Sequence, residues 1–391
     1  MPWKETCVTD ERRLFIEDFL AGQETIKELC KKYGISEKTG HKWKKRFMEK
    51  GISGLCDESR APQNSPNQLD EDTVIRLLNI RTAHPSWGPK KLAVLYKRAY
   101  PNDPAPSESS IYRVLGKAGL IKKRRIRSVD TAGVKLMRRQ IQADEPNDVW
   151  TVDFKGWWYS SQQKCLPLTI RDLKSRYILA IVLMEAGTAE AVKSVFKKLF
   201  LKYGMPKAIR SDNGSPFATV NGLLGLTTLS AWWMSLGIIP DRIEPGKPTQ
   251  NGSHERMHAD LSREIQGNIL GGVKANQEAI DLWADEYNTV RPHEALLMKT
   301  PSEVYCRSER DFVDEEIEWA YPLGFETRKV CKHGCVKVKK KRYLVSSSLR
   351  GLTAGLQPQD DDSQYLVWIG DFPLALLDTR LDCVKPMDIL Q

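Results

Sequence analysis

The sequence predicts a multidomain α/β protein, in which two helical segments precede a mixed α/β segment and a C-terminal segment of short strands. Three observations predict this. Apolar residues recur at helical spacing within residues 8–120. From 147 to 302, β-branched and aromatic runs alternate with amphipathic stretches, the pattern of a mixed sheet covered by helices. From 322 onward, short alternating segments separated by glycines are typical of a small antiparallel β-barrel.

The composition is that of a globular chain with a basic excess. Its 391 residues are too many for one ordinary domain, and 41% of them are hydrophobic and 28% charged. Sixty Lys and Arg against fifty Asp and Glu give a formal charge of +10, which favours a polyanionic partner. No apolar run approaches the roughly 18 residues of a membrane span, and the N-terminus lacks an apolar signal region. We therefore expect a cytoplasmic protein without a membrane partner.

The first helical segment, residues 1–50, has the helix-turn-helix pattern. Gly34 suits a turn between helices, and Ser36 is a good N-cap for a basic third helix. Lys38 and Lys42 on that helix are candidate DNA contacts. A small bundle with a solvated basic face is the alternative interpretation. Residues 51–69, rich in Ser, Pro, Asn and Gly, indicate a linker.

The second helical segment, residues 70–121, repeats this layout. A helix is expected from Lys90 to Tyr100, and Ser107 can cap a further helix that carries Arg113, a candidate DNA contact. Two such modules in tandem suit a long DNA sequence better than a short half-site.

A basic segment at residues 122–146 joins the helical modules to the mixed α/β segment. Lys122, Arg124 and Arg125 belong to a run with five basic residues in six positions. Such a run is usually a solvated linker, but here a phosphate-contacting arm is an equally good interpretation.

Three carboxylates mark the mixed segment, residues 147–302. Asp153 interrupts an apolar, β-branched strand, and Asp212 follows a short apolar strand and precedes the turn dipeptide Asn-Gly. Glu255 lies where a loop gives way to a helix. Two strand carboxylates and one helix carboxylate can hold a pair of Mg²⁺ or Mn²⁺ ions about 3.5–4 Å apart, the arrangement used for in-line displacement at phosphorus. Without metal, their mutual repulsion should raise at least one pKa.

The expected elements of this segment alternate along the chain. Strands are expected at 149–158, 165–172, 177–184, 206–211 and 238–243, and helices near 188–203, 226–235, 253–267 and 274–288. Three strands, a helix, a strand and further helices give a mixed five-stranded sheet with helices on both faces.

The residues around the carboxylates carry a resemblance. Val-Asp-Phe-Lys-Gly at 152–156, Ser-Asp-Asn-Gly at 211–214 and Pro-Gly-Lys-Pro-Thr-Gln-Asn-Gly-Ser-His-Glu-Arg at 245–256 resemble the DDE transposases of bacterial insertion sequences, relatives of retroviral integrases. Asn-Thr-Val-Arg-Pro-His-Glu-Ala-Leu at 288–296 resembles the end of that catalytic core. The resemblance covers roughly residues 8–390. The gap before Glu255 is longer than in many relatives, and residues 216–227 look like the extra length.

The resemblance implies an RNase H-like core that binds two Mg²⁺ or Mn²⁺ ions through Asp153, Asp212 and Glu255. It implies cleavage of DNA at the terminal inverted repeats of a mobile element, then strand transfer into target DNA by a dimer or larger assembly. The basic stretch at 337–342 has the position of an integrase's C-terminal DNA-binding barrel, within a module expected at 322–391 after a connector at 303–321. By itself the stretch would be an ordinary charged edge strand.

Basic residues near the carboxylates are further candidates for DNA contact. Arg256 and Arg263 lie seven residues apart and share one face of the helix that begins near Glu255. Lys155 lies two residues beyond Asp153 and is a weaker candidate. The helical stripe Met257, Leu261 and Ile265 should anchor this helix to the sheet.

The eight cysteines show no paired metal-binding or redox spacing and are expected to be free thiols. Cys331, His333 and Cys335 could form a metal clip. We favour a hairpin turn there, because a fourth ligand has no obvious source and Gly334 suits a turn.

Two other functional classes are compatible with parts of the sequence. One is a DNA-binding regulator that retains an inactive catalytic scaffold, against which the three complete acidic motifs argue. The other is a stand-alone RNase H-like nuclease, which the two helix-turn-helix modules and the C-terminal module make a poorer interpretation.

Overall fold

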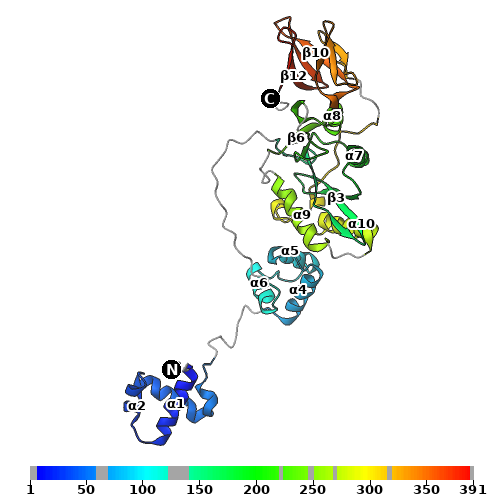
Figure 1. Ribbon diagram of the computed structural model, residues 1–391. Helices are drawn as coiled ribbons and strands as arrows, with labels where there is room; N and C mark the ends of the chain where they lie inside the picture. The colour runs from blue at the N-terminus through cyan, green and yellow to red at the C-terminus, as the bar shows by residue number, and fades with distance from the viewer. Residues whose placement is uncertain are drawn as a thin grey trace. The chain divides into compact units, whose positions relative to one another are not determined.

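The structure is a computed structural model that describes residues 7–58, 69–121, 141–219, 223–244, 251–266, 271–314 and 319–387. The chain forms two compact units, Met1–Asp70 and Glu71–Gln391, which are described separately below (Figure 1). No helix in these described ranges is long and apolar enough to cross a membrane.

The first unit contains the helices α1 (Val8–Ala21), α2 (Ile26–Lys32) and α3 (Glu37–Lys50). The expected turn is present, with Gly34 at a φ of 64° and the Ser36 side chain accepting a hydrogen bond from Thr39 N–H at 3.2 Å. The core is formed by Phe15, Ile16, Leu29, Cys30, Trp43 and Leu55. Leu55 lies in a 3-10 helix, Gly51–Leu55, so the start of the expected linker is part of this folded unit.

The second unit begins with three helices: α4 (Glu71–Ala83), α5 (Pro89–Ala99) and α6 (Glu108–Lys117). Ser107 caps α6 as expected, accepting from Ser110 N–H at 3.2 Å. Their shared core is formed by Leu77, Leu92, Tyr96, Ile111 and Leu115, all of which are at most 1% exposed. This module therefore has a hydrophobic core of its own.

The mixed segment forms a single sheet. Its strands are β1 (Val149–Phe154), β2 (Trp158–Ser160), β3 (Gln163–Asp172), β4 (Ile178–Met184), β5 (Ala208–Ser211) and β6 (Ile239–Arg242). β3 pairs antiparallel with β1, β2 and β4, while β1, β5 and β6 run parallel. The helices are α7 (Ala189–Tyr203), α8 (Thr228–Ser235), α9 (Gly252–Glu264) and α10 (Gly272–Thr289).

The first strand is shorter than expected. We predicted one strand over 149–158, but β1 ends at Phe154 and β2 starts at Trp158. Lys155 N–H still donates to Pro167 O at 3.1 Å, and β2 then continues the pairing with β3 from Trp158 opposite Cys165. The sheet therefore has six strands in place of the five expected, because the first strand is interrupted after Phe154, one residue beyond Asp153.

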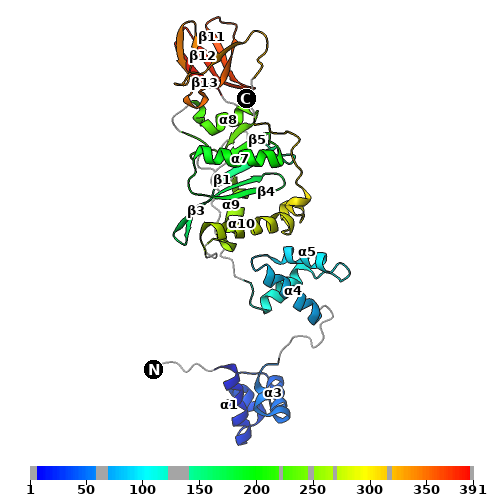
Figure 2. The ribbon, with the colours of Figure 1, turned by 90° about the vertical axis from the view of Figure 1, so that its right-hand side faces the viewer.

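Helices cover both faces of the sheet (Figure 2). On one face, α7 and α8 bury an aromatic cluster against β1, β3 and β5. On the other, α9 and α10 pack through Met257, Leu261 and Ile265, the predicted stripe, together with Trp283 and Tyr287. Because side chains alternate along a strand, Trp150 and Val152 of β1 face the first cluster, and Thr151 and Asp153 face α9.

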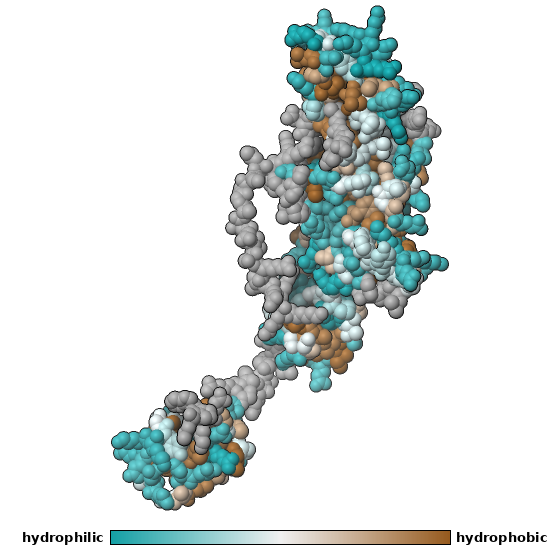
Figure 3. All heavy atoms as spheres, in the orientation of Figure 1, coloured by the Kyte–Doolittle hydropathy of each residue, from teal (hydrophilic) through white to brown (hydrophobic). Residues whose placement is uncertain are grey.

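The C-terminal module is an open sheet, which corrects the predicted closed barrel. Its strands are β7 (Glu326–Lys329), β8 (Cys335–Val338), β9 (Lys341–Leu344), β10 (Thr353–Pro358), β11 (Gln364–Ile369), β12 (Phe372–Asp378) and β13 (Cys383–Pro386). Five of them form an antiparallel sheet in the order β13-β12-β11-β10-β7, and β8 and β9 form a separate hairpin. Among the described strands, no hydrogen-bonded ladder joins the hairpin to the sheet, so the ring is not closed. Figure 3 shows hydrophilic residues over the outer end of this module and hydrophobic ones toward the core.

Candidate active site

The parallel pairing of β1 and β5 brings two of the predicted carboxylates together. Thr151 lies opposite Arg210 in the register. Continuing that register by two residues places Asp153 level with Asp212, just past the end of β5. Asp212 closes a turn by accepting from Gly214 N–H at 3.1 Å, so its carboxyl group is fixed where the chain leaves the sheet.

The third carboxylate comes from α9, which packs on the same face of the sheet as Asp153. Glu255 lies in the first turn of this helix and is exposed. The buried neighbours His254 and Met257 hold the turn against β1 and β3, so Glu255 projects from a fixed backbone.

The electrostatics of Asp153 indicate that the three carboxylates act on one another. Its side chain is 20% exposed. Burial raises the pKa of Asp153 to about 7, with further contributions from the charges of Asp212 and, more weakly, Glu255. This is the mutual repulsion expected from the sequence, and a cation placed among the three groups would relieve it.

Beneath Asp153, a buried hydrogen-bond network joins α9 to β1 and β3. Thr169 Oγ1 donates to Asp153 O at 2.9 Å and also contacts His254 Nε2 at 2.6 Å and His258 Nε2 at 2.7 Å. The other ring nitrogen of His254, Nδ1, lies 2.7 Å from Thr151 Oγ1. His254, Thr151 and Thr169 are fully buried, so these bonds are made away from water.

The donors and acceptors of this network can be assigned by counting hydrogens. The single hydroxyl hydrogen of Thr169 is used on Asp153 O, because a carbonyl can only accept. His254 Nε2 and His258 Nε2 must then both donate to Thr169. Burial lowers the pKa of His258 to about 3 and that of His254 well below its ordinary value, so both rings are neutral and both carry the proton on Nε2.

With the proton of His258 on Nε2, its other ring nitrogen is a hydrogen-bond acceptor that faces the half-buried Asp153 carboxyl group. The unprotonated Nδ1 of His258 lies 3.9 Å from Asp153 Oδ2. Asn251 Nδ2 donates to the same Oδ2 at 3.4 Å, and Asn251 Oδ1 is buried without a hydrogen-bond partner among the described groups. The Asp153 carboxyl group is thus accompanied by two further acceptors, His258 Nδ1 and Asn251 Oδ1.

These groups fit a divalent cation. Carboxylate and amide oxygens are the ligands that Mg²⁺ prefers, and the orphaned oxygen of Asn251 lies beside Asp153. Within the described ranges, no three His, Cys, Asp or Glu side chains already stand close enough to hold a metal ion. Closing the last distance would therefore require rotation of the exposed Glu255 or the half-buried Asp212 side chain toward Asp153.

Sequence reasoning missed the two histidines and two threonines of this network as functional residues. A spacing signal was present for one of them, because His258 follows Glu255 by three residues and so lies on the same side of a helix. No local signal marked Thr151 or Thr169, since a threonine within a strand is an ordinary strand residue.

The predicted DNA contacts near the carboxylates differ in exposure, since one is buried and two lie at the surface. Lys155 is 6% exposed, and its ammonium group contacts the Gln266 side-chain oxygen and lies 5.2 Å from the Trp158 ring. Its ammonium group is therefore engaged within the protein, and its contact with DNA stays a prediction. Arg256 and Arg263 are exposed. Arg256 Nε lies 4.0 Å from Oδ2 of the buried Asp260, and Arg263 Nη1 lies 3.2 Å from its Oδ1.

The remaining predicted contacts lie in the helical modules. Lys38, Lys42 and Arg113 are exposed on α3 and α6. Lys122, Arg124 and Arg125 fall outside the described residues. The Lys42 ammonium lies 4.6 Å from the Trp43 ring, which leaves it available to an anion on its outer side.

The alternative metal clip at Cys331 and Cys335 is a turn, as favoured above. Gly334 has a φ of 80°, and its N–H donates to Cys331 O at 2.8 Å. All eight cysteines are free thiols.

Comparisons with known families match most of these regions. An integrase core domain is matched over residues 143–248, and a second model of the same description matches residues 236–301. A homeodomain-like domain is matched over residues 8–56, and another over residues 39–115. The integrase core matches together include Asp153, Asp212 and Glu255.

Two similar proteins come from insertion elements. The uncharacterized 31.7 kDa protein of insertion element IS407 from Burkholderia multivorans is 28% identical over 241 residues, covering 61% of this chain and 82% of the relative. The uncharacterized 39.2 kDa protein of IS476 from Xanthomonas euvesicatoria is 24% identical over 243 residues, covering 62% and 67%.

Similar solved structures are integrases. The HTLV-2 integrase catalytic core domain in complex with magnesium has a TM-score of 0.33 at 16% identity and covers 42% of this chain and 100% of that one. The simian T-cell lymphotropic virus intasome in complex with a PP2A regulatory subunit has a TM-score of 0.36 at 13% identity, covering 77% and 98%. The chain therefore contains regions similar to the integrase core domain and to homeodomain-like domains, and it is similar to two proteins of bacterial insertion elements, in agreement with the resemblance that its three acidic motifs carry.

Proposed function

We propose that the protein is a DDE transposase that binds the terminal repeats of a mobile DNA element and catalyses metal-dependent strand cleavage and strand transfer into target DNA. The observation that carries this proposal is the half-buried Asp153, which lies level with Asp212 and whose pKa is raised to about 7 by partial burial and by the charges of Asp212 and Glu255. A carboxyl group held in this way is costly to the fold and is useful where it receives a divalent cation.

In this mechanism Asp153, Asp212 and Glu255 would hold two Mg²⁺ or Mn²⁺ ions. When bound, the ions would lower the pKa of the attacking water or 3′-hydroxyl and stabilise the leaving oxygen. Asp153, whose pKa is raised to about 7, would have to be deprotonated to serve as a ligand, and Glu255 would reach the same cation from α9. The network of Thr169 and His254 keeps α9 at a fixed distance from β1, so the carboxylates approach one scissile phosphate from two sides.

The helical modules would read the DNA ends. Exposed lysines on α3, with Lys38 and Lys42 at its start and middle, suit contacts to phosphates and base edges. The exposed Arg113 on α6 suits the same role in the second module. Joining two ends to one target requires two active sites, which favours a dimer or larger assembly on DNA.

The test is nicking of a duplex that carries the element's own terminus, found by sequencing the repeats that flank the gene. With Mg²⁺ or Mn²⁺ the protein should nick this duplex, and Asp153→Asn, Asp212→Asn and Glu255→Gln should each abolish nicking while sparing DNA binding. Glu185→Gln, which removes an exposed carboxylate of the same domain, is the matched control. Undiminished nicking by any of the three variants would remove that residue from the site. Binding without any nicking by the wild type would favour a regulator.

The assembly has its own test. A subunit defective in DNA binding (Lys38→Ala with Lys42→Ala) is mixed with a catalytically inactive one (Asp153→Asn). If one subunit binds an end that another cuts, the mixture should recover cleavage that neither variant has alone. No recovery, together with a monomeric mass on DNA, would contradict an assembly that cuts in trans.

A further inference from the structure

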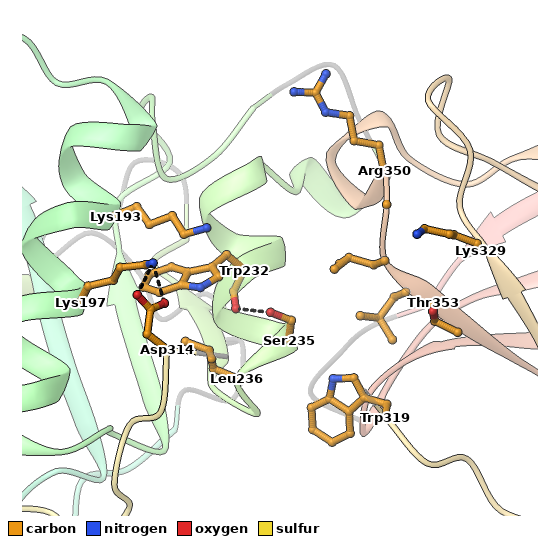
Figure 4. Close-up of a pocket in the computed structure, with 13 residues that line it drawn as sticks. Lys193, Lys197, Trp232, Ser235, Leu236, Asp314, Trp319, Lys329, Arg350 and Thr353 are labelled. Carbon is orange, nitrogen blue, oxygen red and sulfur yellow. Dashed lines mark hydrogen bonds and ion pairs between the residues drawn. The ribbon is translucent and has the colours of Figure 1, made fainter. Parts of the chain in front are cut away.

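A cleft of about 430 Å³ lies between the catalytic core and the C-terminal module (Figure 4). Lys193 and Lys197 reach it from α7 and Trp232 from α8, while Lys329 and Arg350 belong to the C-terminal module. We call this site the interdomain cleft. Its volume is within the roughly 300–1,000 Å³ of typical ligand sites.

The two walls of the cleft are held together by an apolar interface. Leu226, Ala231 and Met234, in and just before α8, are buried in the same cluster as Leu349 and Val330 of the C-terminal module. Ser348 Oγ also donates to Leu226 O at 2.7 Å. The cleft is therefore a fixed feature of this unit, because opening it would expose that interface to water.

The charges that line the cleft are mostly positive. Asp314 is its one acidic lining residue among those described, and both of its carboxylate oxygens are taken by the Lys197 ammonium, at 2.5 and 2.7 Å. Within the described part of the chain, Lys193, Lys329 and Arg350 make no ion pair. Three cations therefore border a concave site without a described counter-charge.

The pKa of Lys193 reflects the positive charge gathered at the cleft. Its ammonium lies 4.9 Å from the Trp232 ring, and burial, then the charge of Lys197, lowers its pKa. An anion bound between Lys193 and Arg350 would reverse this, since an opposite charge stabilises the ammonium form. Figure 4 shows Lys193 and Lys329 extending toward the space between the two walls.

We propose that the interdomain cleft binds the phosphodiester backbone of DNA through Lys193, Lys329 and Arg350. The inference rests on the proposed function, which makes DNA the polyanion that this protein handles. The side chains have the chemistry of phosphate contacts, since they offer ammonium and guanidinium donors, and the one acidic lining residue that the structure describes, Asp314, is paired with Lys197. Because such contacts go to phosphates, they carry no sequence information.

This contact is separate from the catalytic carboxylates. The cleft lies on the side of α7 and α8, whereas Asp153 faces α9 across the sheet. A DNA segment in the cleft is therefore distinct from the scissile phosphate, and it would be bound whether or not the metal site is filled.

The test uses the full chain in EDTA and measures affinity for duplex DNA as a function of salt. Lys329→Glu with Arg350→Glu reverses two exposed charges of the cleft. Removing two phosphate contacts should make the slope of log affinity against log salt shallower by about 2 and weaken binding by at least about tenfold at moderate salt. The loss should be the same factor for a terminal-repeat duplex and for a scrambled one.

The matched control is Arg380→Glu with Lys385→Glu, which makes the same charge change in the same module. These residues are exposed, and Lys385 lies on β13, at the opposite edge of the sheet from the β7 strand that carries Lys329. The control should keep the wild-type slope. Equal losses in both pairs, or no loss in either, would overturn the proposal.

Two further outcomes separate other ligands and other failures. If titration shows that inorganic phosphate or a mononucleotide binds in the cleft while the charge reversal leaves duplex affinity unchanged, the site takes a free anion and the DNA proposal is wrong. A loss confined to the terminal-repeat duplex would mean base reading and would also overturn it. Because binding is measured without metal, failure of catalysis would leave this result intact, and the Asp153→Asn background should reproduce it.

Discussion

Both faces of the mixed sheet bury an apolar cluster, but only the face toward α9 also buries a polar network beside Asp153. Toward α7 and α8 the clustered side chains are apolar and include several aromatic rings, and Phe196 contacts both Phe200 and Trp233. Toward α9 the sheet buries Thr151 and Thr169 beneath the helix that carries the third carboxylate. Both faces belong to the same strands.

The difference teaches where stability and function are located. Apolar burial is non-directional and tolerates small shifts, so the α7 face can hold the fold together without fixing a geometry. A buried hydrogen-bond network contributes less net free energy, but it specifies distances between the groups it joins. We infer that the polar network of the α9 face contributes less to the free energy of unfolding than an apolar core would, and that it fixes the position of Asp153 relative to α9.

The largest expected effect tests the apolar face. Phe196→Ala should reduce the free energy of unfolding by about 3–5 kcal/mol, because it leaves a cavity beneath Phe200 and Trp233. Nicking per folded molecule should not change. Urea unfolding and single-turnover nicking at low temperature measure the two quantities. The control Leu201→Ala, at a side chain 61% exposed on the same helix, should stay within about 0.5 kcal/mol of the wild type.

The next effect concerns the buried carboxylate. Raising the pKa of Asp153 from 3.8 to about 7 means that the folded state binds this proton more tightly than the unfolded state. The resulting stability is present at low pH and is lost as pH rises from about 4 to 7, by at most about 4 kcal/mol at 1.36 kcal/mol per pKa unit. In EDTA, Asp153→Asn should therefore be more stable than the wild type at pH 8, with little difference at pH 4.5.

Because the buried histidines also titrate, the result of this experiment is the difference in unfolding free energy between Asp153→Asn and the wild type at each pH. His258 has a folded pKa of about 3, so it contributes stability above its unfolded pKa that is lost as pH falls. His258 is present in both proteins, so comparing the two at each pH removes most of its effect. A stability gain from Asp153→Asn that is equal at pH 8 and pH 4.5 would contradict the raised pKa.

Disrupting the polar network should reduce the free energy of unfolding less than Phe196→Ala does, but it should reduce the nicking rate more. Thr169→Val keeps the shape but leaves the Nε2–H groups of His254 and His258 without their acceptor, at a cost of about 1–3 kcal/mol. Nicking should fall at least about tenfold, in kcat rather than in DNA affinity. Thr169→Ser restores the hydroxyl and should recover most of the rate. Equal rates in the valine and serine variants would mean that the network has no part in positioning.

The smallest effect tests a predicted DNA contact that lies buried. Lys155→Met retains the aliphatic part of the side chain and removes an ammonium that contacts Gln266 inside the protein. DNA affinity and its salt slope should be unchanged, because the ammonium group is bound to Gln266 within the protein. A slope shallower by about 1 would show that Lys155 contacts DNA after all.

Local patterns in the sequence were sufficient to predict the helices and strands of the mixed segment, while the role of the three carboxylates stays a prediction. The helices and strands of the mixed segment begin and end within a few residues of the expected bounds, apart from the break after Phe154. At that break the Lys155 side chain contacts Gln266, a residue far along the chain. Pro216 to Thr227 was expected to be extra length, but Phe217 within it is 1% exposed and packs against Phe154.

Contacts between distant segments could not be predicted in the same way. The Thr169 and His254 hydroxyl–imidazole bond joins residues 85 positions apart, and it depends on the register between β1 and β3 and on the rotation of α9. The interdomain cleft likewise joins α7 to residues near 350. Closure of the C-terminal sheet depends on strand pairing between β7 and β8, which alternation of hydropathy along each strand does not specify.

The central claim is that Asp153, Asp212 and Glu255 form one cation site in which Asp153 carries a proton until metal binds. Calorimetric titration with Mn²⁺ in buffers of different ionisation enthalpy measures the protons released on binding. With a pKa of about 7 for Asp153, close to one proton per site should be released at pH 6 and almost none above pH 8. Asp153→Asn should abolish this release and weaken binding. Tight Mn²⁺ binding without proton release at pH 6, or an unchanged titration in Asp153→Asn, would contradict the account.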